Sequence, residues 1–307
     1  MVTRVTTPGN YSAVLANLLK AQRNQMEAGD KVSTQKNGQD LKDYAKSSEL
    51  LTAMRSVQTR LGVYEDQNKL LTDKLDTQNT ALTRVADAAQ AVRQIFAEAL
   101  ASGRADTLVE DVQAELRNAV EGMNARYGGK YLFAGGQVDT RPVTATSLTD
   151  LTAGPPIASF FKNDTFKVTA KLDEATTVTT GVLADDIGTD LLTAFQTFQT
   201  FNAGTPFTGA LTQAQQTFLE GQLANWDSVR ADVTNITAYN GVNQKRLETI
   251  AEDITTRQNS LAGMLGDITD ADMAKAAAEL QQAQLAVQSA AYVFQSLQES
   301  SLINLLR

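Results

Sequence analysis

The side chains that could carry out chemistry in this chain are limited, because its 307 residues include no Cys and no His. Disulfides, thiolate or imidazole nucleophiles, and zinc or haem ligation through these two residue types are therefore excluded. The Ser side chains have no possible His base, and no pair of carboxylates stands out from a solvated helix face. The sequence thus predicts a protein that is not an enzyme and that holds no cofactor.

One acidic cluster suggests a metal site, since carboxylate oxygens are the ligands of calcium. It consists of Asp267, Asp270 and Asp272. The cluster lacks the glycine and the terminal glutamate of a calcium-binding loop. We therefore expect no metal here, and expect Asp270 to cap the N-terminus of the following helix.

Two glycine pairs, Gly128-Gly129 and Gly135-Gly136, could suggest a phosphate-binding loop. Such a loop requires a following Lys-Ser or Lys-Thr at the start of a helix, and neither pair has one. Glycine pairs between extended segments are typical of tight turns. We therefore predict turns at both positions.

The charge balance narrows the possible partners. Lys and Arg number 27 against 35 Asp and Glu, a formal net charge of −8, which disfavours a nucleic-acid binder because phosphate contacts need a cationic face. No apolar run approaches the length of about 18 residues that a membrane span needs. The first residues make a poor cleaved signal peptide. Neither nucleic acid nor membrane is an expected partner.

The positions of the prolines indicate how the chain is organised. All five prolines lie at position 8 or between 142 and 206, so residues 9–141 and 207–307 lack the strongest helix breaker. Between these helical regions, Phe166, Val168, Ala170 and Leu172 alternate with polar residues, which predicts a strand. Residues 185–201 return to helical spacing.

The long regions carry heptad stripes of apolar residues, which predict coiled-coil packing. The first stripe contains only two polar members, Asn68 and Gln78, which either set the register or face solvent. The lone Trp226 is expected to anchor a core or an interface. The two stripes consist of Leu50, Met54, Val57, Leu61, Tyr64, Asn68, Leu71, Leu75, Gln78, Leu82, Val85, Ala89, Val92, Phe96 and Ala99, and of Val229, Val233, Ile236, Asn240, Asn243, Leu247, Ile250, Ile254, Arg257, Leu261 and Met264.

Shorter stripes complete the helical pattern. After a break at Gly103, a stripe from Val109 to Met123 should fold back antiparallel to the first rod. Near the start, a stripe from Val14 to Gln25 is followed by the polar stretch 29–40. Beyond Gly266 a last stripe continues almost to the end of the sequence. These terminal apolar faces are expected to meet a partner or another part of the chain.

Four strings carry a family resemblance. They are GGKYLFAGG at 128–136, YNGVNQKRL at 239–247, ITDADMA at 268–274 and SLINLLR at 301–307. Together with helical arms on either side of a β-containing middle, they resemble the bacterial flagellin superfamily. The hairpin motif Tyr131, Leu132, Phe133 and Gly135 is similar to that of the hook-filament junction members, also called hook-associated protein 3. The loop VSTQKNG at 32–38 departs from the Leu-Ser-Ser-Gly-Lys that is common in this family.

The resemblance implies a structural subunit of the external flagellum, exported by the flagellar type III apparatus without a cleaved signal. Its implied role is an adaptor that joins the hook-side junction protein to the flagellin filament, with copies of itself in a ring-like homo-oligomer. A flagellar export chaperone is the implied partner before secretion. The expected subunit-interface residues are Val14, Leu18, Leu280, Val287, Phe294, Leu297, Leu302 and Leu305.

The expected fold is mainly α with a small β-containing domain, in which the N- and C-terminal regions form long antiparallel helical rods. The predicted parts are an N-terminal assembly arm (1–49), a helical rod with a β-hairpin (50–136), a β-rich outer domain (137–184), a returning rod (185–264) and a C-terminal assembly arm (265–307). Two alternatives stay open. One is a flagellin or minor flagellin, and the more distant one is a cytoplasmic coiled-coil scaffold.

Overall fold

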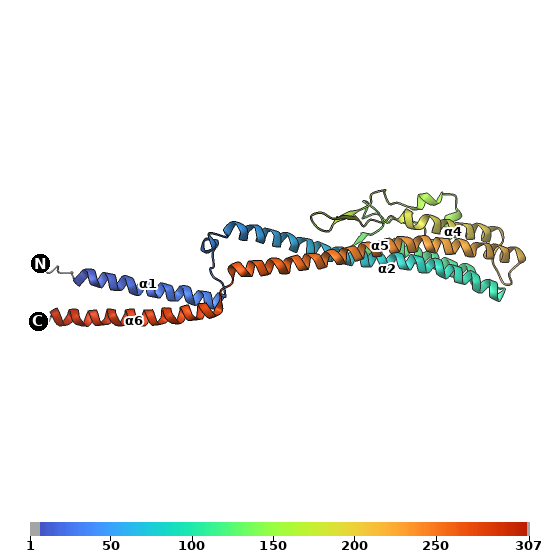
Figure 1. Ribbon diagram of the computed structural model, residues 1–307. Coiled ribbons are helices and arrows are strands. Elements are labelled where there is room, and N and C mark those ends of the chain that lie inside the picture. The colour runs from blue at the N-terminus through green and yellow to red at the C-terminus, as the bar shows by residue number, and fades with distance from the viewer. Residues whose placement is uncertain (1–6, 306–307) are drawn as a thin grey trace. The chain divides into compact units, whose positions relative to one another are not determined.

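The computed structural model describes the backbone of residues 7–305 and the side chains of residues 11–298. Long helices dominate it and the strands are few and short, so the predicted mainly α fold with a small β part is confirmed (Figure 1). The chain divides into two compact units, residues 1–60 with 256–307 and residues 61–255. Each unit is described by itself below.

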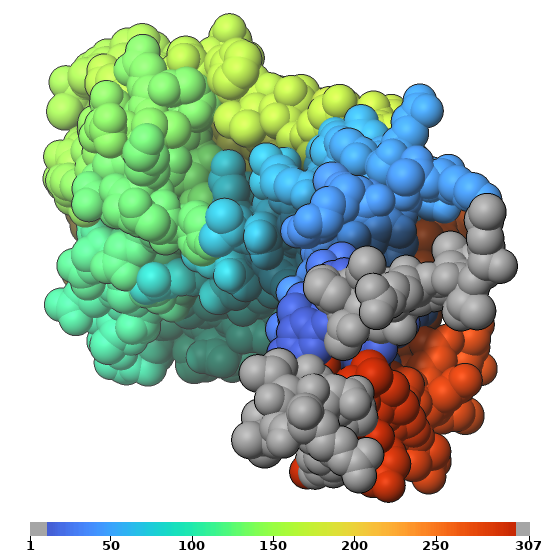
Figure 2. Space-filling view, turned by 90° about the vertical axis from the view of Figure 1, so that its left-hand side faces the viewer, coloured from blue at the N-terminus to red at the C-terminus, as the bar shows by residue number. Residues whose placement is uncertain are grey.

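The first unit pairs the two ends of the chain. Helix α1 packs against helix α6, and the two lie side by side in both Figure 1 and Figure 2. The unit also contains the short helix η1, the first turns of α2 and the last turns of α5. The bounds are α1 Thr7–Thr34, η1 Leu41–Tyr44, α2 Ser48–Ser102, α5 Gln213–Thr269 and α6 Met273–Leu305.

The second unit packs the remainder of α2 and α5 with two shorter helices and two hairpins. Its core joins apolar side chains from α2, α3, α4 and α5. The remaining bounds are α3 Leu108–Met123, α4 Ala184–Gly204, η2 Asp150–Thr152, η3 Ile157–Phe160, β1 Arg126–Tyr127, β2 Lys130–Tyr131, β3 Thr169–Lys171 and β4 Thr177–Thr179.

An aromatic cluster forms the centre of that core. Trp226 is fully buried, with its ring 4.9 Å from Phe195 and 6.2 Å from Phe96 in edge-on arrangements. Phe198 stacks on Phe207 at 5.4 Å. Edge-on and offset contacts are the geometries that aromatic quadrupoles favour. Trp226 is therefore a core anchor, one of the two roles expected from sequence.

The turns predicted at glycine pairs are present. The antiparallel hairpin β1–β2 pairs Tyr127 with Lys130 across Gly128 and Gly129, whose φ angles of 57° and 81° suit a two-residue turn. Gly103, with φ 66°, directly follows the last residue of α2 and lets the chain reverse into α3. The predicted break after α2 and the folding back of α3 are thus confirmed.

The β part is smaller than the alternation predicted. The hairpin β3–β4 has three residues in each strand, and Phe166 lies before β3 with 59% of its surface exposed. Leu172 and Val178 are its buried apolar side chains. Prolines at 142, 155 and 156 keep the earlier part of 137–184 in loops and the short helices η2 and η3.

Two helix boundaries and the burial at the ends of the heptad stripes also differ from expectation. Helix α1 continues to Thr34 through the polar stretch, where Lys31 pairs with Glu279 of α6 at 3.1 Å. Helix α5 passes Gly266 and ends at Thr269. Toward the ends of the two heptad stripes, Leu50 and Met264 are 54% and 57% exposed. A burial prediction from heptad spacing assumes that another element packs against the whole length of the stripe. No described element packs closely against the side chains of Leu50 and Met264.

Candidate functional site

The paired arm α1–α6 is the first candidate site. The two helices run antiparallel, since Tyr11 contacts Phe294 at 5.0 Å between ring centres while Lys31 bonds Glu279 toward the other end. Small residues at the contact, Ala21, Ala28, Ala276 and Ala283, are buried and let the helices approach closely. The arm is therefore a two-helix pair formed within one chain.

The structure describes the side chains of six of the eight predicted interface residues. The six that lie in the described part, Val14, Leu18, Leu280, Val287, Phe294 and Leu297, are all half-buried on the two paired helices. Leu302 and Leu305 lie outside the residues whose side chains are described. The role of these positions between subunits stays a prediction.

A second apolar stripe on the arm was missed in the sequence. Its side chains are strongly exposed, with Leu19 at 53%, Leu285 at 58% and Tyr292 at 76%. They lie one or two positions along the helix from the half-buried residues of the pair, so a search for a single heptad stripe passes over them. Leu15 and Leu19, or Leu285 and Tyr292, recur at spacings of four and seven, which could have revealed them. The stripe is Leu15, Leu19, Met26, Leu285, Tyr292 and Val293.

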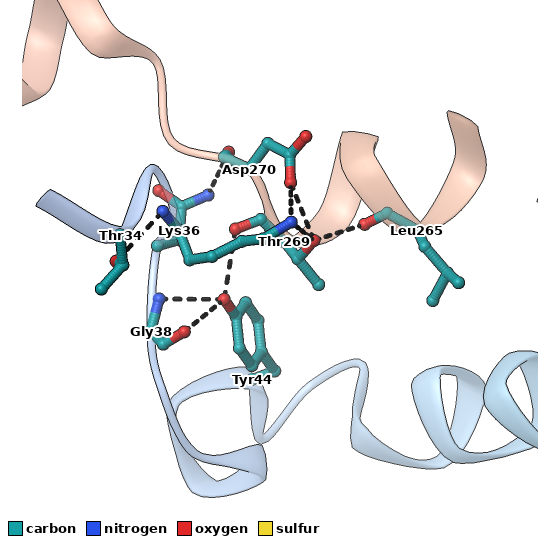
Figure 3. Close-up of polar contacts among 8 residues, drawn as sticks. Thr34, Lys36, Gly38, Tyr44, Leu265, Thr269 and Asp270 are labelled. Carbon is teal, nitrogen blue, oxygen red and sulfur yellow. Dashed lines mark hydrogen bonds and ion pairs between the residues drawn. The ribbon is translucent and has the colours of Figure 1, made fainter. Parts of the chain in front are cut away.

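The second candidate site is the joint, which we define as residues 34–44 together with residues 265–272 (Figure 3). Here the connection leaving α1 meets the end of α5 and the residues that follow it in one isolated antiparallel bridge. Asn37 N donates to Thr269 O at 2.8 Å and Ala271 N donates to Gln35 O at 2.9 Å, with Lys36 opposite Asp270. The joint therefore links two connections that are far apart in sequence.

Side chains reinforce this backbone pairing. Lys36 Nζ forms an ion pair with Asp270 and donates to Thr269 Oγ1 at 3.3 Å, while Asn37 Nδ2 donates to Asp270 O at 2.8 Å. The Tyr44 hydroxyl accepts from Gly38 N at 2.9 Å and has Gly38 O and Thr269 O within 3.2 Å for its single proton. Of these contacts, the Lys36–Asp270 ion pair joins two charged groups, and such a charge-assisted bond is stronger than one between neutral groups.

Gln35 explains how the joint departs from the family pattern. Its φ of 58° is the only positive value of a non-glycine residue in the described part of the chain. A side chain in this left-handed region costs about 1 kcal/mol, which glycine avoids. The family motif Leu-Ser-Ser-Gly-Lys has a glycine at the corresponding place, whereas this chain holds the left-handed turn with a residue that is strained there.

Two residues of the acidic cluster at the joint, Asp270 and Asp272, make structural hydrogen bonds and an ion pair. Asp272 caps α6, because its Oδ1 accepts from Ala274 N at 2.9 Å and Lys275 N at 3.1 Å. The prediction that Asp270 is the cap was wrong, since its carboxylate turns back to Lys36. That contact lowers the pKa of Asp270. Within the described residues, no group of three or more acidic side chains is placed to hold a metal ion.

The hairpin motif packs around Asp164. Leu132 and Phe133 are buried, and the Asp164 carboxylate accepts from Gly136 N and Phe166 N at 2.9 Å each, which lowers its pKa. Gly135 has φ 68°, and a Cβ there would lie 2.1 Å from Asp164 Oδ1. Tyr131 stays at the strand, where Arg126 covers its ring at 4.1 Å. The motif is therefore built for tight packing.

The polar seam residues bind the hairpin β3–β4. Asn68 Nδ2 donates to Leu172 O at 3.1 Å, and Gln78 Nε2 donates to Thr180 O at 3.2 Å and to Asn240 Oδ1 at 3.1 Å. Asn243 Nδ2 donates to Thr179 O at 3.0 Å. Of the two roles considered from sequence, solvent contact is ruled out, because Asn68 and Gln78 are buried.

Comparison with protein-family models shows to which family this chain belongs. The model of the bacterial flagellin N-terminal helical region matches residues 5–137, and that of the bacterial flagellin C-terminal helical region matches residues 223–306. The chain belongs to the flagellin family. This flagellin-family protein is thus a structural component of the bacterial flagellum.

Solved structures share the fold of this flagellin-family chain. A putative flagellar hook-associated protein from Vibrio parahaemolyticus matches with a TM-score of 0.60 at 16% identity, covering 74% of this chain and 100% of the other. FlgL from Bacillus cereus matches with a TM-score of 0.54 at 14% identity, covering 71% and 99%. A comparison with curated proteins gave no match. No described helix is long and apolar enough to cross a membrane.

Proposed function

We propose that this protein is the adaptor at the hook-filament junction, joining the hook-side junction protein to the flagellin filament. The observation that carries the proposal is the unpartnered apolar stripe on the α1–α6 arm, because the pair buries one face within the chain and leaves Leu285 and Tyr292 in solvent. A structural subunit of the flagellum gains burial for such residues only from its neighbours. One solved structure with this fold is described as a putative flagellar hook-associated protein, which supports the junction over the filament.

Assembly through this arm has a thermodynamic rationale. A single long helix with a one-sided stripe buries too little surface to offset the entropy of ordering it. Pairing α1 with α6 reduces that deficit, and contact with neighbouring copies removes it. We infer a ring-like homo-oligomer of this chain, with Val14, Leu18, Leu280 and Phe294 inside each arm and the exposed stripe between arms.

Export is part of the same proposal. We infer that the chain leaves the cell through the flagellar type III apparatus and that a flagellar export chaperone covers the apolar residues of α6 before assembly. Such a chaperone would bind an amphipathic helix in a groove. No catalytic role is proposed.

The gene-deletion phenotype tests the proposal. Bare hooks in electron micrographs, with flagellin lost to the medium, are the expected result. Shortened filaments would contradict the adaptor role and support a minor flagellin, which the match to both flagellin helical regions favours as the second candidate. Unchanged flagella would contradict both and return the cytoplasmic scaffold to consideration.

A further inference from the structure

The joint contains a dipeptide with chemistry of its own. The sequence has two Asn-Gly pairs, Asn37-Gly38 in the joint and Asn240-Gly241 within α5. The backbone nitrogen that follows an asparagine can attack the side-chain amide carbon, and glycine obstructs this attack least because it has no Cβ. The joint needs glycine at position 38, since a Cβ there would lie 2.3 Å from Asp43 Cβ. The reactive pair is thus a consequence of close packing.

In the closed joint the reacting groups are engaged elsewhere. Gly38 N, the attacking atom, donates to the Tyr44 hydroxyl at 2.9 Å. Asn37 Nδ2, the leaving group, donates to Asp270 O at 2.8 Å. Both contacts must break before the nitrogen can reach the amide carbon. The side chain of Asn37 is otherwise exposed, so water can reach it once the joint opens.

We propose that Asn37 is a self-modification site that the closed joint protects and whose conversion prevents the joint from closing again. The nitrogen of Gly38 bonds to Cγ of Asn37, ammonia leaves, and a five-membered imide forms. Water then opens the imide to aspartate or isoaspartate. The net reaction consumes one water and releases one ammonia, with no change of oxidation state.

The product alters the electrostatics of the joint. A carboxylate at position 37 has no proton to donate to Asp270 O, so an attractive contact becomes a repulsive one. Five further carboxylates, of Asp40, Asp43, Asp267, Asp270 and Asp272, belong to the same joint. The nearby ammonium groups, Lys36 and Lys42, already pair with Asp270 and Asp40. The added charge therefore favours the open joint.

The second Asn-Gly pair is an internal control. Asn240 is fully buried, its Nδ2 donates to Leu75 O at 3.0 Å, and its glycine lies in the middle of helix α5. Intrahelical bonding holds that glycine nitrogen away from the side chain. Asn240 should not convert while the protein is folded.

The experiment incubates the purified full chain at mildly alkaline pH and follows both asparagines by peptide mass spectrometry. Asn37 should convert more slowly in the folded chain than in urea. Tyr44→Phe removes one hydrogen bond and so makes opening of the joint more frequent. Conversion of Asn37 in this variant should be about fivefold faster than in the parent. Tyr239→Phe, which removes a hydroxyl bond to Thr179 O in the other unit, should leave the rate at Asn37 unchanged.

Two results would overturn the proposal: equal rates at Asn37 in the folded and unfolded chain, or no acceleration in Tyr44→Phe. The consequence for closure is tested with Asn37→Asp and Asn37→Ala, which both lose the amide donor. Hydrogen exchange at the Ala271 amide should be faster in Asn37→Asp than in Asn37→Ala. Equal exchange would reject the effect of the added charge.

Discussion

At several positions of this flagellin-family protein, the residue type is determined by a close contact with a neighbouring side chain. A family motif alone does not explain these contacts. Gly135 faces Asp164, Gly38 faces Asp43, and Asp272 caps α6 while Asp270 turns to Lys36. In each case the residue type follows from what stands within a few ångströms of it. Substitutions at these positions should therefore have effects that depend on the neighbour as well as on the backbone.

Gly135→Ala should destabilise the second unit by about 2 kcal/mol, through a strained backbone and displacement of the Asp164 carboxylate. Gly128→Ala is the matched control, because its φ is also positive and no atom lies within 4 Å of an added Cβ. It should cost only the backbone part, about 1 kcal/mol. Urea unfolding followed by Trp226 fluorescence measures both, and equal losses would show that the Asp164 contact is unimportant.

Gln35→Gly should stabilise the joint by about 1 kcal/mol, since glycine adopts the φ of 58° without strain. Hydrogen exchange at the Asn37 and Ala271 amides should slow accordingly. Gln35→Ala keeps the strain and should show no gain. Faster exchange in the glycine variant would mean that the Gln35 side chain contributes more than its backbone costs.

The joint should weaken in acid because Lys36, and then Thr269, lower the pKa of Asp270. A lowered folded-state pKa contributes stability that is fully present above the unfolded value of about 4 and is lost as pH falls through the folded value. We therefore expect the protection of the Ala271 amide against hydrogen exchange to decrease in the parent protein once the pH is lower than about 4. In Asp270→Asn, measured at the same pH values, this decrease should be absent. The same pH profile in both proteins would exclude this ion pair as the cause.

At the scale of elements, the long helices use polar residues to dock a small hairpin. The strands β3 and β4 are too short to be stable alone, and Leu172 and Val178 provide their apolar burial. Side-chain amides from α2 and α5 donate hydrogen bonds to carbonyl oxygens of the hairpin and of the residue that follows it. The polar members of the heptad stripes thus position a β element.

Gln78→Leu should cost about 2 kcal/mol, because it leaves Thr180 O and Asn240 Oδ1 without this donor inside the second unit. Hydrogen exchange in the hairpin should rise with it. Gln244→Leu is the control on α5: it removes a bond to the exposed Asp76 carboxylate and should change stability by less than about 0.5 kcal/mol. Equal effects from the two variants would contradict the docking role.

At the scale of the whole molecule, the two compact units suit different tasks. The second has the large apolar and aromatic core expected of an independently stable body. The first consists of paired helices whose outer apolar residues remain exposed. Such a unit gains stability when a partner covers its exposed apolar residues, as elements that take part in assembly commonly do.

Removal of residues 281–307 should therefore leave the second unit folded while abolishing self-association, since α1 loses its partner. Trp226 fluorescence and size-exclusion chromatography measure the two effects. A full-length control, Leu285→Asp with Tyr292→Asp, alters only the exposed stripe and should keep α1 helical while losing assembly. Filament growth supported by the truncated protein would reject the assembly role of this arm.

Much of this architecture was determined by the sequence alone. The positions of the prolines and the heptad spacing predict the long helices, and Gly103 and Gly128-Gly129 predict the reversals, because these are local preferences of the backbone. Only the tertiary structure decided what covers each stripe. The sequence left open whether Asn68 faces solvent, and it did not show that Asp270 pairs with Lys36. Both outcomes depend on residues more than a hundred positions away. Periodicity shows which face of a helix is apolar, but the partner of that face is set by how the whole chain packs.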